Sequence, residues 1–265
     1  MASSSGSPKY KDVLKKEQEY IDAIIKNLRK NHPTYAHEIE RRLEVDSEHL
    51  GAWYELMVYD WLWKLEKNPS PQPFAPDGKS KPDFMFASND KSVYVDVASV
   101  QESEKDKELV ESQAFVQSQS LSSFATMRER LLDKAGKHKS ISHVGNVYII
   151  CLGLESPSID IEDVKTCFIG NDSYNILSGK LQAAINGEIF ERENNKSFLV
   201  KYKNVSAILV AKRNYSLRED ANKLAFGLIQ NPYAINEIQP TEFGEVSRFV
   251  VLRKTEKYFE MGWQH

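Results

Sequence analysis

The sequence predicts an α/β fold in which a central mixed β-sheet is flanked by helices, with an N-terminal helical layer. Two strongly apolar runs, residues 147–152 and 205–211, have the composition of buried strands. Residues 81–98 have the pattern of a hairpin, because two apolar, β-branched or aromatic segments flank a short polar gap. Helix-favouring segments separate these strands, and that alternation is typical of a sheet covered on both faces.

Three helices are predicted before the hairpin. Residues 9–30 are charged and helix-favouring, and Pro33 ends that run. Residues 35–43 form the second helix. The third is capped by Asp46 or Ser47 and has the strongest helical periodicity in the chain. Its apolar positions are Leu50, Trp53, Tyr54, Met57, Val58, Trp61, Leu62 and Leu65. We divide the chain into residues 1–45, a tail with helices, and residues 46–265, a core with a C-terminal extension.

The segments after the hairpin complete the predicted order of elements. In sequence they are a helix over 108–137 with a break near 118–123, a strand over 144–154, a helix over 159–168, short hairpin strands at 188–190 and 197–202, a strand over 205–211, a turn at 231–234, a strand over 248–252 and a terminal helix over 254–262.

The hairpin brings two acidic residues together. If residues 88–91 are the loop, Ala87 pairs with Ser92, and the same register sets Asp83 opposite Asp96. Directly opposite side chains lie roughly 4.5–5.5 Å apart at Cβ, where two carboxylates repel. Such a pair needs a compensating cation, and clustered carboxylate oxygens are what Mg²⁺ takes. The alternative is an exposed hairpin with scattered acids and a different loop register.

Alternation along the second strand predicts what each of its faces carries. Val93, Val95 and Val97 share one face of that strand. The other face carries Tyr94, Asp96 and Ala98. Asp96 is therefore expected on the face opposite the three valines.

The overall composition excludes several classes of protein. The net charge of −3 exerts no general attraction for nucleic acid, so binding would need a local patch. Two cysteines without a CxxC motif indicate a reduced compartment, and we expect a cytoplasmic protein. Residues 147–152 are too few to span a bilayer, and residues 1–8 lack the apolar segment of a signal peptide.

No other cofactor chemistry has support in the sequence. The six histidines form no zinc motif, and neither GxGxxG nor a Walker motif occurs. Cys151 falls in the middle of an apolar strand, where a buried, inert thiol is expected.

A carboxylate on the third helix, the Pro-Asp pair and a second acid thirteen positions later resemble the PD-(D/E)xK, or restriction-endonuclease-like, nuclease superfamily. The matching residues are Glu55, Pro82-Asp83 and Asp96-Val97-Ala98. Further segments resemble an uncharacterised bacterial branch of it: Gly51-Ala52-Trp53-Tyr54-Glu55-Leu56, Ser80-Lys81-Pro82-Asp83-Phe84, Lys134-Ala135-Gly136-Lys137 and Asn231-Pro232-Tyr233-Ala234. The resemblance covers roughly residues 46 to 235 and rests on short motifs.

This resemblance implies metal-dependent hydrolysis of phosphodiester bonds. Asp83, Asp96 and the main-chain carbonyl of Val97 would hold Mg²⁺ or Mn²⁺, joined by Glu55 directly or through water. Glu55 falls at the border of the apolar stripe of its helix, so it either reaches solvent or leans into a cleft beside the sheet. A lysine near the attacking water would help it lose a proton and stabilise developing negative charge.

The sequence departs from the superfamily at the lysine position, which is Ala98 here. Lys134, on the helix that follows the hairpin, is the first substitute. It shares a helix face with Arg130 and Lys137, for which we expect contacts with nucleic acid; the alternative is a solvated face. Other candidates for the role of the missing lysine are Gln101, Lys105, Gln113 and Gln117.

Three functions are compatible with the sequence. The first is a Mg²⁺-dependent endonuclease that acts on DNA in defence or repair. The second is a degenerate nuclease-like fold that binds nucleic acid or supports a protein assembly, for which Ala98 is the main argument. The third is a protein-binding domain that uses its N-terminal helices, with a homodimer or a larger assembly as the product.

Overall fold

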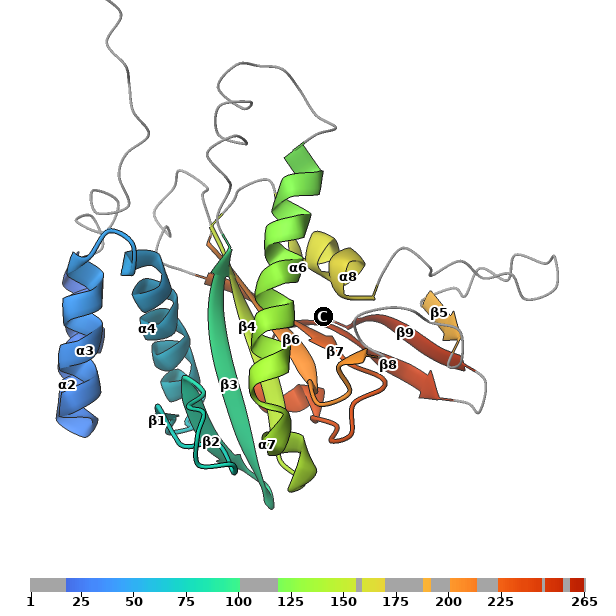
Figure 1. Cartoon of the computed structure of the whole chain (residues 1–265), viewed down its shortest axis with the longest axis horizontal. Helices are drawn as coiled ribbons and strands as arrows, with labels where there is room; N and C mark the ends of the chain where they lie inside the picture. Colours follow the sequence, from blue (N-terminus) through green and yellow to red (C-terminus); the bar gives the residue numbers. More distant parts are fainter. Residues whose placement is uncertain are drawn as a thin grey trace, which may run out of the picture.

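The computed structural model describes residues 18–100, 119–155, 159–169, 188–191, 201–213, 224–244, 246–254 and 258–264. The strands in these ranges form one mixed sheet in the order β1-β2-β3-β4-β6-β7-β8-β9-β5 (Figure 1). They are β1 (Ser70–Pro71), β2 (Phe84–Ser88), β3 (Lys91–Val100), β4 (Val147–Leu154), β5 (Glu188–Glu191), β6 (Ala207–Arg213), β7 (Leu224–Gln230), β8 (Ser247–Lys254) and β9 (Tyr258–Gln264). The predicted α/β class with a central mixed sheet is confirmed.

Helices cover both faces of this sheet. They are α2 (Gln18–Asn31), α3 (Pro33–Glu44), α4 (His49–Lys64), α6 (Gln119–Lys137), α7 (Lys139–His143), α8 (Ile161–Ile169) and the 3₁₀ turn η1 (Pro240–Phe243). One apolar core joins α2, α3 and α4 to the sheet, and a second core on the opposite face joins α6 and α8 to it (Figure 1). The N-terminal helices therefore share a core with α4 and form the expected helical layer.

The hairpin has the predicted register. Ala87 lies opposite Ser92, and Phe84 lies opposite Val95, so Asp83 directly precedes the first paired residue of β2. The turn is tight, with Asn89 at a φ of 50°, a left-handed conformation that Asn tolerates. The register therefore leaves Asp83 beside Asp96, as the spacing predicts.

The strand β3 runs between two cores, and its side chains alternate as predicted. Val93, Val95 and Val97 belong to the core under α4, whereas Tyr94 and Ala98 belong to the core under α6. A strand paired in parallel and covered on both faces must be apolar on both. A charged side chain at such a position, as at Asp96, needs partners of its own.

The strand β4 pairs in parallel with both β3 and β6, and every one of its residues is buried. Position 153, near the end of β4, has room only for a glycine, because a Cβ there would lie 2.3 Å from the Tyr54 ring on α4. Gly227 on β7 has the same role for α8, since its Cβ would lie 2.0 Å from Ile161 Cδ1. Both glycines let a helix approach the sheet closely.

The C-terminal part of the chain corrects the sequence prediction. Residues 258–264 form strand β9, not the terminal helix predicted over 254–262, because they pair with β8 on one side and β5 on the other. The strand β7 was not predicted. The predicted partner of β5, residues 197–202, lies outside the described residues except for 201 and 202, which are not in a strand.

Two smaller details of the helices also bear on the predictions. The residue before α4 is Glu48, which makes no side-chain cap, so neither Asp46 nor Ser47 caps this helix. Residues 9–17 of the first predicted helix and 108–118 of the long one lie outside the described ranges. None of the helices that the structure describes has the length and apolarity needed to cross a bilayer.

Candidate active site

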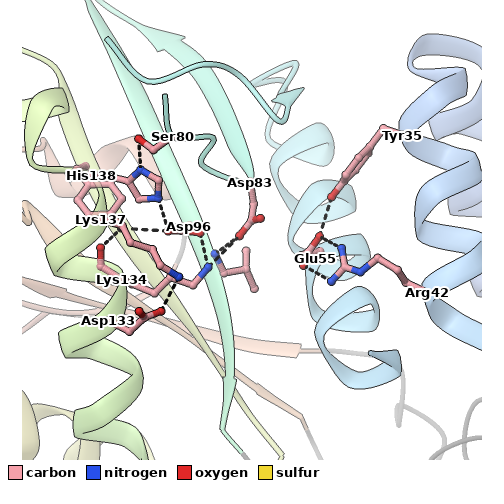
Figure 2. Close-up of polar contacts among 12 residues, drawn as sticks. Tyr35, Arg42, Glu55, Ser80, Asp83, Asp96, Asp133, Lys134, Lys137 and His138 are labelled. Atoms are coloured by element: carbon pink, nitrogen blue, oxygen red, sulfur yellow. Dashed lines mark hydrogen bonds and ion pairs between the residues drawn. The ribbon is translucent and has the colours of Figure 1, made fainter. Parts of the chain in front are cut away.

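Asp83 and Asp96 converge beside helix α6 (Figure 2). Asp96 lies within β3 on the face that α6 covers, and only 1% of its side chain is exposed. Asp83 lies at the entrance to β2, with 19% of its side chain exposed. The predicted pair therefore exists, with one acid fully buried and the other only partly exposed.

Helix α6 places Lys134 in contact with both acids. Met127, Leu131 and Ala135 recur every four residues and are buried against the sheet, which sets the side of the helix that faces β3. Lys134 borders that stripe, and its Nζ lies 2.5 Å from Asp96 Oδ1 and 3.8 Å from Asp83 Oδ2. The substitute lysine predicted from the sequence therefore contacts both members of the acidic pair.

The charge of Lys134 is fixed by these acids. Burial lowers the pKa of Lys134, but the carboxylates of Asp83 and Asp96 outweigh it and raise the pKa above its ordinary value. The side chain is therefore an ammonium at neutral pH.

The second oxygen of Asp96 has its own donors. His138 Nε2 lies 2.9 Å from Asp96 Oδ2, and the Tyr148 hydroxyl donates to the same oxygen at 3.2 Å. Burial would raise the pKa of Asp96, but the hydrogen bond from His138 and the charge of Lys134 lower it well below the ordinary value. Asp96 therefore stays ionised although it is buried.

Asp83 has the opposite protonation behaviour. The main-chain N–H of Val97 donates to its Oδ2 at 2.6 Å. Burial raises the pKa of Asp83 well above its ordinary value, and the carboxylates of Glu55 and Asp96 raise it further, against the effect of Lys134. Two neighbouring carboxyl groups with pKa values pushed apart are typical of functional sites.

Glu55 is paired with side chains of helix α3, although its carboxylate is close enough to raise the pKa of Asp83 (Figure 2). Arg42 donates from Nη1 and Nη2 to its two oxygens at 2.7 Å each, and the Tyr35 hydroxyl donates at 3.1 Å. Glu55 belongs to the helix on the other face of the sheet from Lys134. Its assignment as a metal ligand stays a prediction, and in the structure its partner is an arginine.

The ion pair between Arg42 and Glu55 should be a strong stabilising contact. We expect Arg42→Met to lower the free energy of unfolding by about 3–5 kcal/mol, because Glu55 would remain buried without its countercharge. Adding Glu55→Gln should recover most of that loss. Urea unfolding of the two single variants and the double variant measures the coupling, and strictly additive effects would contradict this assignment.

Sequence inspection missed His138, which bonds Asp96 through Nε2 and lies 3.0 Å from Ser80 Oγ through Nδ1. The sequence does contain a signal, since His138 follows Lys134 by four residues, one helical turn. Tyr148 was also missed, because its role depends on the pairing of β3 with β4. These side chains bind Asp96 from elements distant in sequence.

The remaining predicted residues lie at or beyond the edge of the cluster. Arg130 and Lys137 are exposed on α6, and Lys137 pairs with Asp133 at 2.7 Å. Cys151 is buried, and burial raises the pKa of its thiol, as expected of an inert cysteine. The other candidates, Gln101, Lys105, Gln113 and Gln117, lie outside the described residues.

The donor set determines which metal the cluster could hold. Within the described ranges, no three side chains of His, Cys, Asp or Glu gather in a way that could hold an ion. Mg²⁺ does not need three, because it keeps several waters and binds through one or two carboxylates plus substrate phosphate. Asp83 and Asp96 fit that requirement if Lys134, which is 20% exposed, moves off Asp96 Oδ1.

Comparison with known proteins adds no assignment. No protein-family model matches this chain, and no curated protein or solved structure matches it either.

Proposed function

We propose that this chain is a Mg²⁺- or Mn²⁺-dependent endonuclease with a restriction-endonuclease-like core that hydrolyses phosphodiester bonds in DNA. One observation carries the proposal. A lysine from a separate helix reaches both of two acidic side chains that a hairpin sets side by side. Paired acids with a nearby ammonium are the groups that metal-assisted phosphodiester hydrolysis requires.

Each residue of the cluster has a defined task in this proposal. Asp83, Asp96 and the carbonyl of Val97 would hold the ion, which lowers the pKa of a bound water and neutralises charge on the phosphate. Lys134 is an ammonium, so it stabilises negative charge on the phosphate and does not act as a base. His138 and Tyr148 hold the carboxylate of Asp96 in one orientation.

In this proposal, exposed cations near Lys134 contact the DNA backbone. Arg130 and Lys137 are on the same helix and are open to solvent. In this proposal they supply the local positive charge that a chain with a net charge of −3 needs, with Lys137 exchanging Asp133 for a phosphate.

The experiment is cleavage of supercoiled plasmid and of single-stranded DNA by the purified chain. We expect cutting with Mg²⁺ or Mn²⁺, none with EDTA, and recovery when the metal is restored. Asp83→Asn, purified in parallel, reports contaminating nucleases, and Asp90→Asn, in the exposed hairpin turn, is the matched active control. Cutting by wild type that persists in EDTA, or equal cutting by Asp83→Asn, would contradict the proposal.

A degenerate, binding-only site is the second candidate, and one observation favours it. Lys134 already compensates the charge of Asp96, so the acids and the lysine could form a structural ion-pair cluster. This candidate predicts intact DNA in every metal together with salt-sensitive retention of DNA.

A further inference from the structure

The loop between β1 and β2 carries an aromatic side chain that the fold does not bury. Phe74 is 61% exposed, the largest value among the exposed large hydrophobic side chains in the described residues. The neighbouring residue Ala75 is buried in the core under α6, so this loop contributes Ala75 to the core and leaves Phe74 outside it. Burying a phenylalanine would contribute about 1.5–3 kcal/mol, a gain that the fold leaves unused here.

This loop has a defined conformation. The main-chain N–H of Gln72 donates to the carbonyl of Asp83, and that of Ala75 donates to the carbonyl of Ser80, both at 2.8 Å. The carboxylate of Asp77 accepts hydrogen bonds from the N–H groups of Lys79 and Ser80, at 2.9 and 3.1 Å. Phe74 is therefore presented to solvent from an ordered segment.

A cation lies against the exposed ring. Lys81 Nζ is 4.6 Å from the centroid of Phe74, within the range of a cation–π contact. Lys81 is itself exposed. An aromatic ring beside an ammonium offers a stacking surface and a phosphate contact in one place, which is the combination that binds single-stranded nucleic acid.

The pair is close to the candidate active site. Lys81 precedes Asp83 by two residues, about 6.6 Å along an extended chain. That separation is short enough for one strand to contact Lys81 and also place a phosphate at Asp83. Ser80, between Phe74 and Asp83 in the chain, also contacts His138 in the site.

We propose that Phe74 stacks on an unpaired base and that Lys81 contacts a neighbouring phosphate, so that the site takes single-stranded DNA or RNA. This inference rests on the proposed function for the nearby scissile phosphate. In a duplex the bases are stacked on one another, and their faces are not available to Phe74.

The test measures binding without cleavage, in the Asp83→Asn background, by fluorescence anisotropy of labelled oligonucleotides. We expect Phe74→Ala to weaken binding of single-stranded DNA about 5- to 150-fold, the equivalent of one stacked base. Phe74→Trp should bind at least as tightly as the parent. Ile235→Ala, which removes a 59% exposed side chain elsewhere, is the matched control and should change nothing.

Further binding measurements distinguish the possible ligands. Lys81→Gln should reduce the slope of log affinity against log salt by about 0.7, the value for one phosphate contact on a single strand. Duplex DNA of the same length should bind the parent and Phe74→Ala equally. A parallel titration with single-stranded RNA shows whether one or both strand chemistries are accepted.

The outcomes distinguish this inference from the nuclease proposal. Equal binding of single strands by Phe74→Ala and the parent, equal losses for single strands and duplex, or no binding of nucleic acid at all would overturn it. If wild type fails to cleave DNA but Phe74→Ala still loses single-strand binding, the stacking site stands and the nuclease proposal falls.

Discussion

Asp96→Asn and Asp83→Asn are both expected to abolish cleavage, but only Asp96→Asn is expected to lower the stability of the fold. Asp96 accepts hydrogen bonds from Lys134 on one oxygen and from His138 on the other. An asparagine has one acceptor oxygen, so one of these donors would face an amide N–H. We expect a loss of about 3–5 kcal/mol, which for this chain length lowers the melting temperature by roughly 6–20 °C.

Asp83→Asn should leave the folded chain at least as stable as wild type. The pKa of Asp83 is raised, so its folded-state carboxyl retains a proton that an ordinary aspartate has lost. An amide is neutral in the same way and can still accept the N–H of Val97.

The pH dependence of the Asp83→Asn effect has a definite sign. The folded chain binds the Asp83 proton more tightly than the unfolded chain, so this group's contribution to stability falls as pH rises from its ordinary pKa through the raised one. The advantage of Asp83→Asn should therefore grow as pH rises from about 4, the ordinary pKa of an aspartate, through the raised pKa of Asp83. The pKa of Asp96 is lowered, so this group contributes stability above its ordinary pKa. That contribution is lost as pH falls through the pKa that Asp96 has in the folded chain.

Metal-free thermal unfolding across this pH range is the measurement. Destabilisation by Asp83→Asn that matches that of Asp96→Asn would show that the two acids are equivalent. The assignment of the proton to Asp83 would then be wrong.

Lys134→Met is expected to lower kcat about 100- to 1,000-fold with a much smaller change in KM, because its ammonium stabilises charge that develops in the transition state. The same variant should bind Mg²⁺ at least as tightly as wild type, since Asp96 Oδ1 loses its competing cation. Lys26→Met, at an exposed lysine on α2, is the control and should retain wild-type kcat.

Steady-state cleavage kinetics and Mn²⁺ titration measure these two effects. An unchanged kcat for Lys134→Met would show that Lys134 takes no part in the chemical step. Weaker Mn²⁺ binding by this variant would show that the lysine supports the ion instead of competing with it.

The hairpin and its acids could be predicted because the relevant physics is local. A short polar gap between two β-forming segments sets the register, and alternation along a strand then assigns each side chain to a face. Both predictions are confirmed, at the Ala87–Ser92 pair and at the division of Val95 and Tyr94 between the two cores. Lys134, the substitute lysine proposed from the sequence, contacts both acids in the structure, and its role in catalysis stays a prediction.

The partners of the acids could not be predicted, because they depend on packing between distant elements. Tyr148 reaches Asp96 across the parallel pairing of β3 with β4. Arg42 reaches Glu55 across the packing of α3 on α4. Neither contact leaves a pattern in the sequence.

The terminal strand was missed for a related reason. Residues 258–264 are a strand because β8 and β5 pair with both of their edges. Such long-range pairing overrides the local preference that favoured a helix. The strand β7 likewise depends on pairing with β6 and β8.

A crystal of the chain soaked in Mn²⁺ shows whether Asp83 and Asp96 hold a metal ion. We expect anomalous density between the carboxylates of Asp83 and Asp96, with Lys134 Nζ moved off Asp96 Oδ1 and toward solvent. A soaked crystal in which Lys134 keeps its contact with Asp96 and no density separates the two acids would show that this cluster is a structural ion pair and does not hold a metal.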